Sequence, residues 1–398
     1  MDYHQTYSAS SSSSHSNHLQ PRVNSQRSLA SVPSLNNNHH HSSSAVYHHC
    51  LTTLKVQDSS YPSSLTLSGK FLYTGSSDRE ISSWNRSFED SDSNSTTNKV
   101  VAGKGAVKSL VIQSDTLFSA HQDHKIRVWK ISNSHQKHTH LATLPTLGDR
   151  AAKVLHPKNQ VQIRRHKKCT WVHHVDTVSA LTLSQDGALL YSVSWDRAIK
   201  IWRTRDFTCL ESLTNAHDDA INAVAVSTDG RVYSGSADKT IKVWGKLQGE
   251  KKHSLLDTME RHNSGVNALA LSGDESLLYS GACDRSVLVW EKEGEDGGRM
   301  VVVGALRGHT NSILCLAVVA VLDLVCSGSA DKTIRIWKGI GHREYSCLAV
   351  LEGHAGSIKC LSAVVDFDDA ADSEASFLVY SGSLDCDVKV WQIFVPAS

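Results

Sequence analysis

Ser234-Gly235-Ser236-Ala237-Asp238 is followed six positions later by Trp244, and Ser327-Gly328-Ser329-Ala330-Asp331 is followed at the same distance by Trp337. The same order of small residues, an aspartate and a tryptophan occurs seven times along the 398 residues. Successive tryptophans lie about 42 to about 73 residues apart, and a period near 40–45 residues indicates a repeated unit of four strands. The seven tryptophans that close these units are Trp84, Trp129, Trp202, Trp244, Trp290, Trp337 and Trp391.

The unit that ends at Trp244 illustrates how each repeat is built. Residues 221–226 alternate between apolar and small or polar side chains, residues 227–230 form a hairpin turn, and residues 231–236 supply a second strand. Short strands separated by turn residues at regular spacing are typical of an all-β fold. We therefore predict an all-β, seven-bladed β-propeller over residues 46–395, counted as one domain because stacked repeats bury one continuous core.

The two ends of the predicted ring complement each other. A strand around Cys50–Leu54 precedes the first complete blade, whereas the last blade ends at Phe394 without an outer strand. Because an unpaired strand edge is left exposed in an open sheet, we expect the N-terminal strand to complete the last blade and close the ring. Residues 1–45 are rich in serine, histidine and asparagine and carry too little apolar surface to fold, so we expect a disordered tail.

Four residue types recur at fixed places in the blades, and this pattern resembles the WD-repeat (WD40) family. In that family a histidine, a serine or threonine, the turn aspartate and the tryptophan form one hydrogen-bonded set in each blade. The resemblance implies these structural sets: His174/Ser192/Asp196/Trp202, His217/Ser234/Asp238/Trp244, His262/Ser280/Asp284/Trp290, His309/Ser327/Asp331/Trp337 and His354/Ser381/Asp385/Trp391. The first two blades keep Thr74/Asp78/Trp84 and Ser119/Asp123/Trp129 without that histidine, and we expect them to be held less rigidly.

Composition argues against several function classes. Five copies of one Ser/His/Asp arrangement are a structural device, because an enzyme needs a single activated nucleophile with an oxyanion hole. We therefore predict no catalytic residue, no cofactor and no metal site, and classify the chain as not an enzyme. The net charge of +1 gives no global case for nucleic acid, so no DNA contact is predicted. No apolar stretch is long enough to span a bilayer, and nine scattered cysteines indicate a reducing, intracellular compartment.

Function in a propeller is expected in the loops, because the blades act as scaffold. The family resemblance implies a partner-binding face formed by the loops before the first strand and after the second strand of each blade. Trp195 is the most distinctive residue there, because the other blades carry smaller, non-aromatic residues directly before the turn aspartate. An exposed tryptophan is a plausible binding hot spot, and packing against a neighbouring loop is the alternative. The expected face comprises Trp195, Lys108, Asn222, Asn267, Leu314, Lys359 and Leu384.

The long gap between Trp129 and Trp202 contains a basic insertion at about residues 147–168. We expect it to lie over the same face as Trp195 and to bring four basic residues there: Arg164, Arg165, Lys167 and Lys168. A basic run beside an aromatic residue suits an acidic protein segment, a phosphopeptide, an inositol phosphate or RNA, and also a nuclear-localisation patch. This insert together with the Ser/His-rich tail is similar to plant WD-repeat proteins of the Jingubang type, which implies a regulator of growth or pollen germination.

These features favour a protein-interaction scaffold for a transcription factor or signalling protein, monomeric and located in cytoplasm and nucleus. The tail adds a second kind of partner, because Ser31 has an arginine four residues before it and a proline two residues after it. Phosphorylated Ser31 would resemble a ligand of 14-3-3 proteins. Two alternatives are a substrate receptor of a cullin-type ubiquitin ligase and a phosphoinositide or RNA binder that uses the basic insert.

Overall fold

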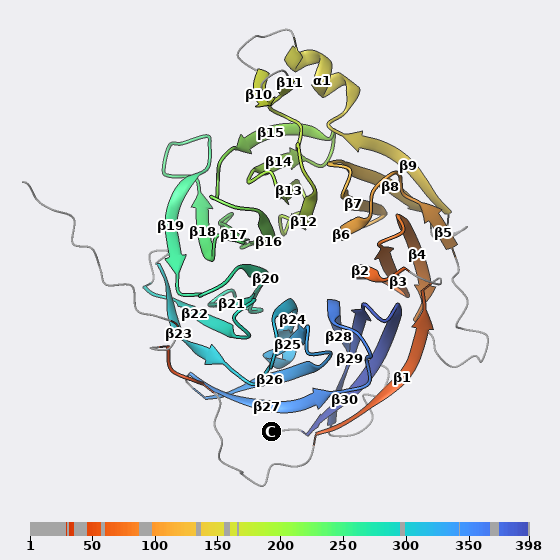
Figure 1. The fold of residues 1–398 in the computed structure, drawn as a ribbon, viewed down its shortest axis with the longest axis vertical. Coiled ribbons are helices and arrows are strands. Elements are labelled where there is room, and N and C mark those ends of the chain that lie inside the picture. Colours follow the sequence, from red (N-terminus) through yellow and green to blue (C-terminus); the bar gives the residue numbers. More distant parts are fainter. Residues whose placement is uncertain are drawn as a thin grey trace, which may run out of the picture.

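Seven four-stranded antiparallel sheets surround a central axis, with the first strand of each sheet innermost (Figure 1). This computed structural model describes residues 29, 32–35, 46–56, 60–86, 98–132, 137–154, 160–164, 167–294, 299–341, 343–366 and 374–396. The predicted seven-bladed, all-β architecture is confirmed. None of the helices in these ranges has the length and apolar character needed to cross a membrane.

Each blade runs outward from the axis in chain order. Blade 1 comprises β2 (Pro62–Ser68), β3 (Phe71–Ser76), β4 (Glu80–Asn85) and β5 (Asn98–Val101). Blade 2 comprises β6 (Val107–Gln113), β7 (Thr116–His121), β8 (Ile126–Ser132) and β9 (Lys137–Leu144). Blade 3 comprises β12 (Val178–Leu183), β13 (Leu189–Ser194), β14 (Ile199–Arg203) and β15 (Thr208–Leu213). Blade 4 comprises β16 (Ile221–Val226), β17 (Val232–Ser236), β18 (Thr240–Gly245) and β19 (Ser254–Glu260). Blade 5 comprises β20 (Val266–Leu271), β21 (Leu277–Ala282), β22 (Val287–Lys292) and β23 (Met300–Leu306). Blade 6 is β24 (Ile313–Val319), β25 (Leu324–Ser329), β26 (Ile334–Gly341) and β27 (Glu344–Leu351), with a 3-10 turn at Ala320–Leu322.

The last blade takes its outer strand from the beginning of the propeller. β28 (Ile358–Asp366), β29 (Glu374–Ser383) and β30 (Asp387–Pro396) are followed in the sheet by β1 (Tyr47–Lys55), which pairs antiparallel with β30. The register places Tyr47 opposite Phe394 and Lys55 opposite Asp387. The ring is therefore closed by strands from both ends of the chain, which removes an open sheet edge.

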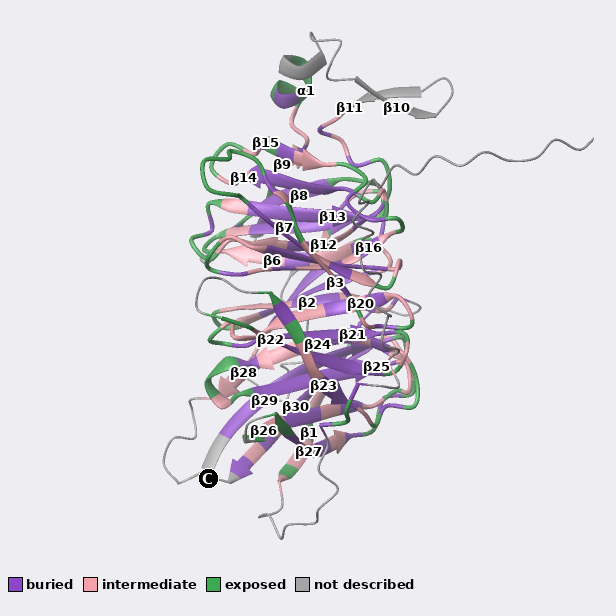
Figure 2. Cartoon of the chain, turned by 90° about the vertical axis from the view of Figure 1, so that its left-hand side faces the viewer, coloured by how far each residue is buried: buried purple, intermediate pink, exposed green. Residues whose placement is uncertain are grey.

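Apolar residues fill the space between adjacent blades. Every residue of β17 and β25 is buried, and Figure 2 shows the buried strands in the middle of the molecule, with exposed residues in the loops at the two faces. The blades approach each other so closely that a Cβ added at Gly281 would lie 2.5 Å from Cγ2 of Ile313 in the next blade. A glycine at that position therefore permits the contact between blades 5 and 6.

A short part of the N-terminal tail packs on the propeller, at residues 29 and 32–35, and is an exception to the disorder expected for residues 1–45. Val32 and Leu35 are buried, with 6% and 8% of their surface exposed. Leu29 is half-buried and packs against the apolar cluster that contains Val32. The physical reason is the spacing of these three apolar residues, which lets a short segment of an otherwise polar tail bury hydrophobic surface.

The insertion between blades 2 and 3 forms a helix and a hairpin at the rim of the ring. α1 (Leu147–Val154) precedes β10 (Gln160–Arg164) and β11 (Lys167–Thr170), which pair antiparallel. The buried Asp149 carboxylate accepts a hydrogen bond from the backbone N–H of Cys209, 3.1 Å away in β15, and so ties α1 to blade 3. Figure 1 shows the helix and hairpin beyond β15, on the outside of the ring.

Candidate functional site

The second residue of every innermost strand is the extra residue of a β-bulge. In each blade the pairing between the first two strands shifts register around this residue. A bulge leaves its extra residue out of the ladder and redirects its side chain. The seven bulged residues are Ser63, Lys108, Ser179, Asn222, Asn267, Leu314 and Lys359. All of them line one cavity of about 490 Å³ at the axis of the ring, here called the channel mouth.

Four of the seven bulged side chains connect one blade to the next. Asn222 donates from Nδ2 to the carbonyl of Val266 at 3.0 Å, and Asn267 donates to the carbonyl of Ile313 at 2.8 Å. The hydroxyl groups of Ser63 and Ser179 donate to the carbonyls of Val107 and Ile221 in the same way. These four residues therefore belong to the framework of the channel mouth.

Two lysines give the channel mouth its charge. Within the described ranges, no carboxylate lies within ion-pair distance of Lys108 or Lys359. Burial lowers the pKa of the Lys108 ammonium, and the positive charge of Lys359 lowers it further. Because Lys108 is partly desolvated and is also repelled by the like charge of Lys359, an anionic group placed between the two lysines would be stabilised.

Trp195 lies at the edge of this charged cavity. Its backbone N–H donates to the carbonyl of Thr177 at 3.0 Å, which fixes the turn, and its side chain is 41% exposed. The ammonium of Lys108 lies 5.7 Å from the centre of the Trp195 ring, a cation–π contact across blades 2 and 3. The ring is therefore accessible to a partner while it also lines the channel mouth.

The structure brings together six of the seven residues expected on the partner-binding face. Leu384 occupies the corresponding turn of blade 7 and is 45% exposed, but it does not line the channel mouth. Sequence reasoning missed Ser63 and Ser179, although both occupy the same strand position as Lys108. Comparing all seven innermost strands at that position would have found them.

The basic insert lies away from the channel mouth, at the outer rim of the ring. Arg164 closes β10, Lys167 and Lys168 begin β11, and Arg165 is outside the described residues. The hairpin sits beyond β15 at the outer rim in Figure 1, whereas the sequence interpretation placed it over the face of Trp195. The insertion continues outward from blade 2 because α1 is anchored on the outermost strand of blade 3.

Five blades hold their tryptophan through a repeated set of hydrogen bonds. In blade 4, His217 contacts Asp238 at 2.8 Å and Ser234 at 2.7 Å, and Trp244 Nε1 donates to the Ser234 hydroxyl at 2.9 Å. The other four complete sets have the same contacts between 2.8 and 2.9 Å. These groups satisfy one another inside the blades and fix the turns that surround the channel mouth.

The five serines at the centre of these sets are completely buried, at 0% exposure: Ser192, Ser234, Ser280, Ser327 and Ser381. Each hydroxyl accepts the indole N–H of the tryptophan in its own blade and contacts the histidine of the same set. A side chain without exposed surface cannot touch a partner protein, and a substrate could not reach its hydroxyl. These five serines are therefore framework residues and belong to no binding or catalytic surface.

The turn aspartates of the sets remain ionised inside the blades. Burial raises the pKa of Asp196, but the charge and hydrogen bond of His174 and the N–H of Val175 outweigh that effect and hold the pKa at about 2. The carboxylate is thus paired at neutral pH, as a buried charge requires.

Blade 2 replaces the missing histidine with one from its own second strand. His121 Nε2 lies 2.8 Å from the hydroxyl of Ser119, which also accepts from Trp129 at 2.8 Å. The expectation of a loosely held blade therefore applies to blade 1, where Trp84 bonds only to Thr74 at 3.0 Å within the recurring set. His121 and Ser119 are two residues apart in one strand and so face the same side, a signal that sequence reasoning could have used. Burial lowers the pKa of His121 to about 4.

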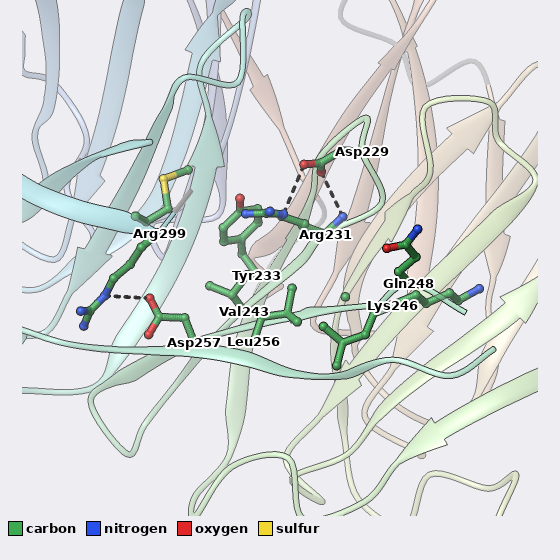
Figure 3. Close-up of a pocket in the computed structure, with 12 residues that line it drawn as sticks. Asp229, Arg231, Tyr233, Val243, Lys246, Gln248, Leu256, Asp257 and Arg299 are labelled. Carbon is green, nitrogen blue, oxygen red and sulfur yellow. Dashed lines mark hydrogen bonds and ion pairs between the residues drawn. The ribbon is translucent and has the colours of Figure 1, made fainter. Parts of the chain in front are cut away.

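A second hollow of about 730 Å³ lies on the outer side of blades 4 and 5 (Figure 3). Four of its five charged side chains are paired with each other, since Arg231 lies 3.3 Å from Asp229 and Arg299 lies 3.1 Å from Asp257, and Lys246 is the fifth. The channel mouth is smaller, yet its lysines have no such partners among the described residues. We therefore take the channel mouth as the candidate site for a charged partner.

The seven sheets and their repeated His–Ser–Trp contacts define a β-propeller of the WD-repeat class. The family model described as "WD domain, G-beta repeat" matches residues 166–203, 207–245, 253–291, 300–338 and 345–392, and the chain belongs to this family. No cluster of three or more His, Cys, Asp or Glu side chains in the described part of the chain is placed to hold a metal ion.

Three curated proteins with different names are similar to parts of this chain. The chain is 34% identical over 124 residues to apoptotic protease-activating factor 1 of Rattus norvegicus, which covers 29% of this chain and 9% of that protein. It is 28% identical to Protein HIRA of Dictyostelium discoideum over 31% of this chain and 13% of that protein. It is 30% identical to the probable cytosolic iron-sulfur protein assembly protein 1 of Kluyveromyces lactis over 27% of this chain and 35% of that protein. This chain therefore spans about a third or less of the length of each of these relatives.

Proposed function

We propose that this chain is a non-enzymatic scaffold that binds partner proteins at the channel mouth, with an acidic or phosphorylated segment of the partner placed between Lys108 and Lys359. The observation that carries the proposal is the convergence of seven bulged side chains on one cavity that contains two lysines without carboxylate partners in the described structure. Trp195 supplies the large, partly exposed aromatic surface typical of a hot spot. Membership of the WD-repeat family supports a protein-interaction role in general.

The physiological setting is the finer part of the proposal. We propose control of a signalling or transcriptional programme, such as plant growth or pollen germination, by a monomer in cytoplasm and nucleus. The insert and tail of the sequence support this setting through their resemblance to plant regulators. Ser31 is outside the described residues, and its recognition by 14-3-3 proteins after phosphorylation remains part of the proposal.

Two other functions would use different surfaces. A phosphoinositide or RNA binder would use the insert, through residues such as Arg164 and Lys168 at the outer rim. A substrate receptor of a cullin-type ligase would use the third-strand end of blade 3, where Arg205 follows Trp202. Substitutions at the channel mouth would leave both activities intact, which separates them from the main proposal.

The proposal is tested by comparing proximity-labelled proteins from cells that express three full-length chains. The wild type is compared with a Lys108→Glu/Lys359→Glu variant and with a Lys251→Glu/Lys252→Glu control, which has the same change in charge on the exposed loop between β18 and β19. We expect a set of proteins that is present with the wild type and the control and absent with the channel variant. Identical sets for all three chains would refute binding at the channel mouth.

A further inference from the structure

Residues 32–35 lie along the free edge of β23, the outermost strand of blade 5. The backbone N–H of Ala305 donates to the carbonyl of Pro33 at 2.9 Å, and the N–H of Leu35 donates to the carbonyl of Ala305 at 3.0 Å. Ser34 thereby forms a parallel bridge with Ala305, and Figure 1 shows this short segment beside β23. An extended segment that adds to a sheet edge is a recurring way in which proteins bind peptides.

The segment also joins two blades. The N–H of Tyr345 in β27, the outermost strand of blade 6, donates to the carbonyl of Leu35 at 3.1 Å. At the other end, the guanidinium of Arg307 donates to the carbonyls of Leu29 and Val32 at 3.2 and 3.0 Å. Main-chain groups of the segment are therefore held at both ends, and such contacts do not depend on the identity of the side chains.

Two apolar pockets bury the side chains of Val32 and Leu35. Val32 packs in the buried cluster that contains Met259 and Met300, and Leu35 packs in a separate cluster with Trp337 and Tyr345. The Leu35 pocket is made by a missing side chain, because the three atoms nearest to a Cβ added at Gly304 all belong to Leu35, the closest at 2.3 Å. The groove thus requires apolar residues three positions apart on an extended backbone.

The Val32 end of the groove shares residues with the hollow between blades 4 and 5. Tyr233, Val243 and Met300 belong to the cluster that buries Val32, and the same residues line the hollow of Figure 3. The cluster that buries Val32 therefore borders this hollow.

We infer that this groove, formed by β23, β27 and Arg307, is a second peptide-binding site that is separate from the channel mouth. In the chain alone, the occupant is the chain's own segment at residues 32–35, with Leu29 packed beside Val32. The ligand class is an extended peptide with the pattern apolar–proline–polar–apolar, as in Val32-Pro33-Ser34-Leu35. Such a ligand from a partner exchanges with the chain's own segment, so the site is occupied in cis at rest and available in trans after release.

The test is a fluorescence anisotropy titration with a labelled peptide that copies residues 27–37. In a full-length Val32→Asp/Leu35→Asp chain the groove is vacated, and we expect the peptide to bind. Binding to the wild type should be at least 30-fold weaker, because a tethered segment competes at an effective concentration on the order of millimolar. Adding Gly304→Val to the vacated chain should weaken binding at least tenfold, and so should a peptide with Leu35→Asp. No binding to the vacated chain, or equal binding to the wild type, would overturn the inference.

A second measurement does not depend on the vacated variant. Gly304→Val in the otherwise wild-type chain should displace Leu35 and accelerate hydrogen exchange of the Leu35 amide at least tenfold. The amide of Leu324, in β25 of the neighbouring blade, should keep its protection. Unchanged exchange at Leu35 would show that the side chain does not depend on this pocket, and would also overturn the inference.

Discussion

The ammonium of Lys108 and the ring of Trp195 face each other across two blades at 5.7 Å, although the two residues are far apart in the sequence. Lys108 is placed by a bulge at the beginning of β6, and Trp195 by the turn after β13. The pair gives the channel mouth both a positive charge and an aromatic surface, which are the two elements that an acidic partner segment with an apolar neighbour requires.

Loss of the Trp195 ring should affect binding and leave the fold intact. We expect Trp195→Ala to weaken a channel-mouth partner by at least about 30-fold, since a central aromatic hot spot contributes about 2 kcal/mol or more. Trp195→Phe keeps an aromatic face toward Lys108 and should retain most of the affinity. Isothermal titration with a partner from the labelling experiment measures both, and equal affinity of the alanine variant would remove Trp195 from the site.

A framework tryptophan should behave in the opposite way. Trp244 is 8% exposed and donates to Ser234, so Trp244→Ala leaves a cavity and removes one hydrogen bond from the Ser234 hydroxyl. We expect a loss of about 3–5 kcal/mol in the free energy of unfolding. Trp195→Ala serves as the matched control and should change it by less than about 0.5 kcal/mol. Urea unfolding provides the comparison, and similar losses for the two variants would contradict the assigned roles.

The replacement histidine of blade 2 should make stability depend on pH. The pKa of His121 is lowered from 6.5 to about 4 in the folded chain, so the unfolded chain binds a proton that the folded chain does not. The contribution of His121 is therefore intact above pH 6.5, falls as the pH drops, and levels off below about 4. Between pH 7 and pH 5 this group alone should cost about 2 kcal/mol.

Removing the imidazole isolates that contribution. A His121→Asn chain should be less stable than the wild type at pH 7, yet lose about 2 kcal/mol less on going to pH 5. The pKa values of His174 and His354 are also lowered by burial and remain in both chains, so they cancel in the difference. Parallel loss of stability in the two chains would rule out His121 as the titrating group.

The contact between blades 5 and 6 predicts sensitivity to a single added side chain. Gly281→Val would place its Cβ 2.5 Å from Ile313, and such overpacking costs typically about 1–3 kcal/mol. Gly148→Val, at a position where an added Cβ meets no atom within 4 Å, is the matched control and should be nearly neutral. A melting temperature for Gly281→Val equal to that of the wild type would mean that the blades can separate without cost.

The ring was predictable because tryptophan and aspartate recur in the sequence with a fixed spacing. Its closure was predictable because the last blade lacks an outer strand and an unpaired strand around Cys50–Leu54 can supply it. Lys108, Asn222, Asn267, Leu314 and Lys359 were predictable for the same reason, as residues at one repeated strand position. The use of His121 was not anticipated, because it enters the network from a different strand than the recurring histidine.

The docked tail lay beyond the repeat pattern. Residues 29–35 have no counterpart in any blade, so no periodicity marks them, and three apolar residues in a serine-rich tail give a weak signal. The predicted position of the insert was wrong for a related reason. Its sequence indicates a helix and basic residues, but the anchor of Asp149 on the Cys209 N–H, which directs it outward, is a contact over 60 positions.

The most direct test of a partner at the channel mouth is photo-crosslinking from two positions in blade 6. A benzoylphenylalanine at Leu314 stands in the channel mouth, whereas one at Val321, which is 77% exposed, stands at the opposite end of the same strand pair. We predict that partner adducts form from position 314 and are absent from position 321. Adducts that form only from position 321, or equally from both, would contradict the account.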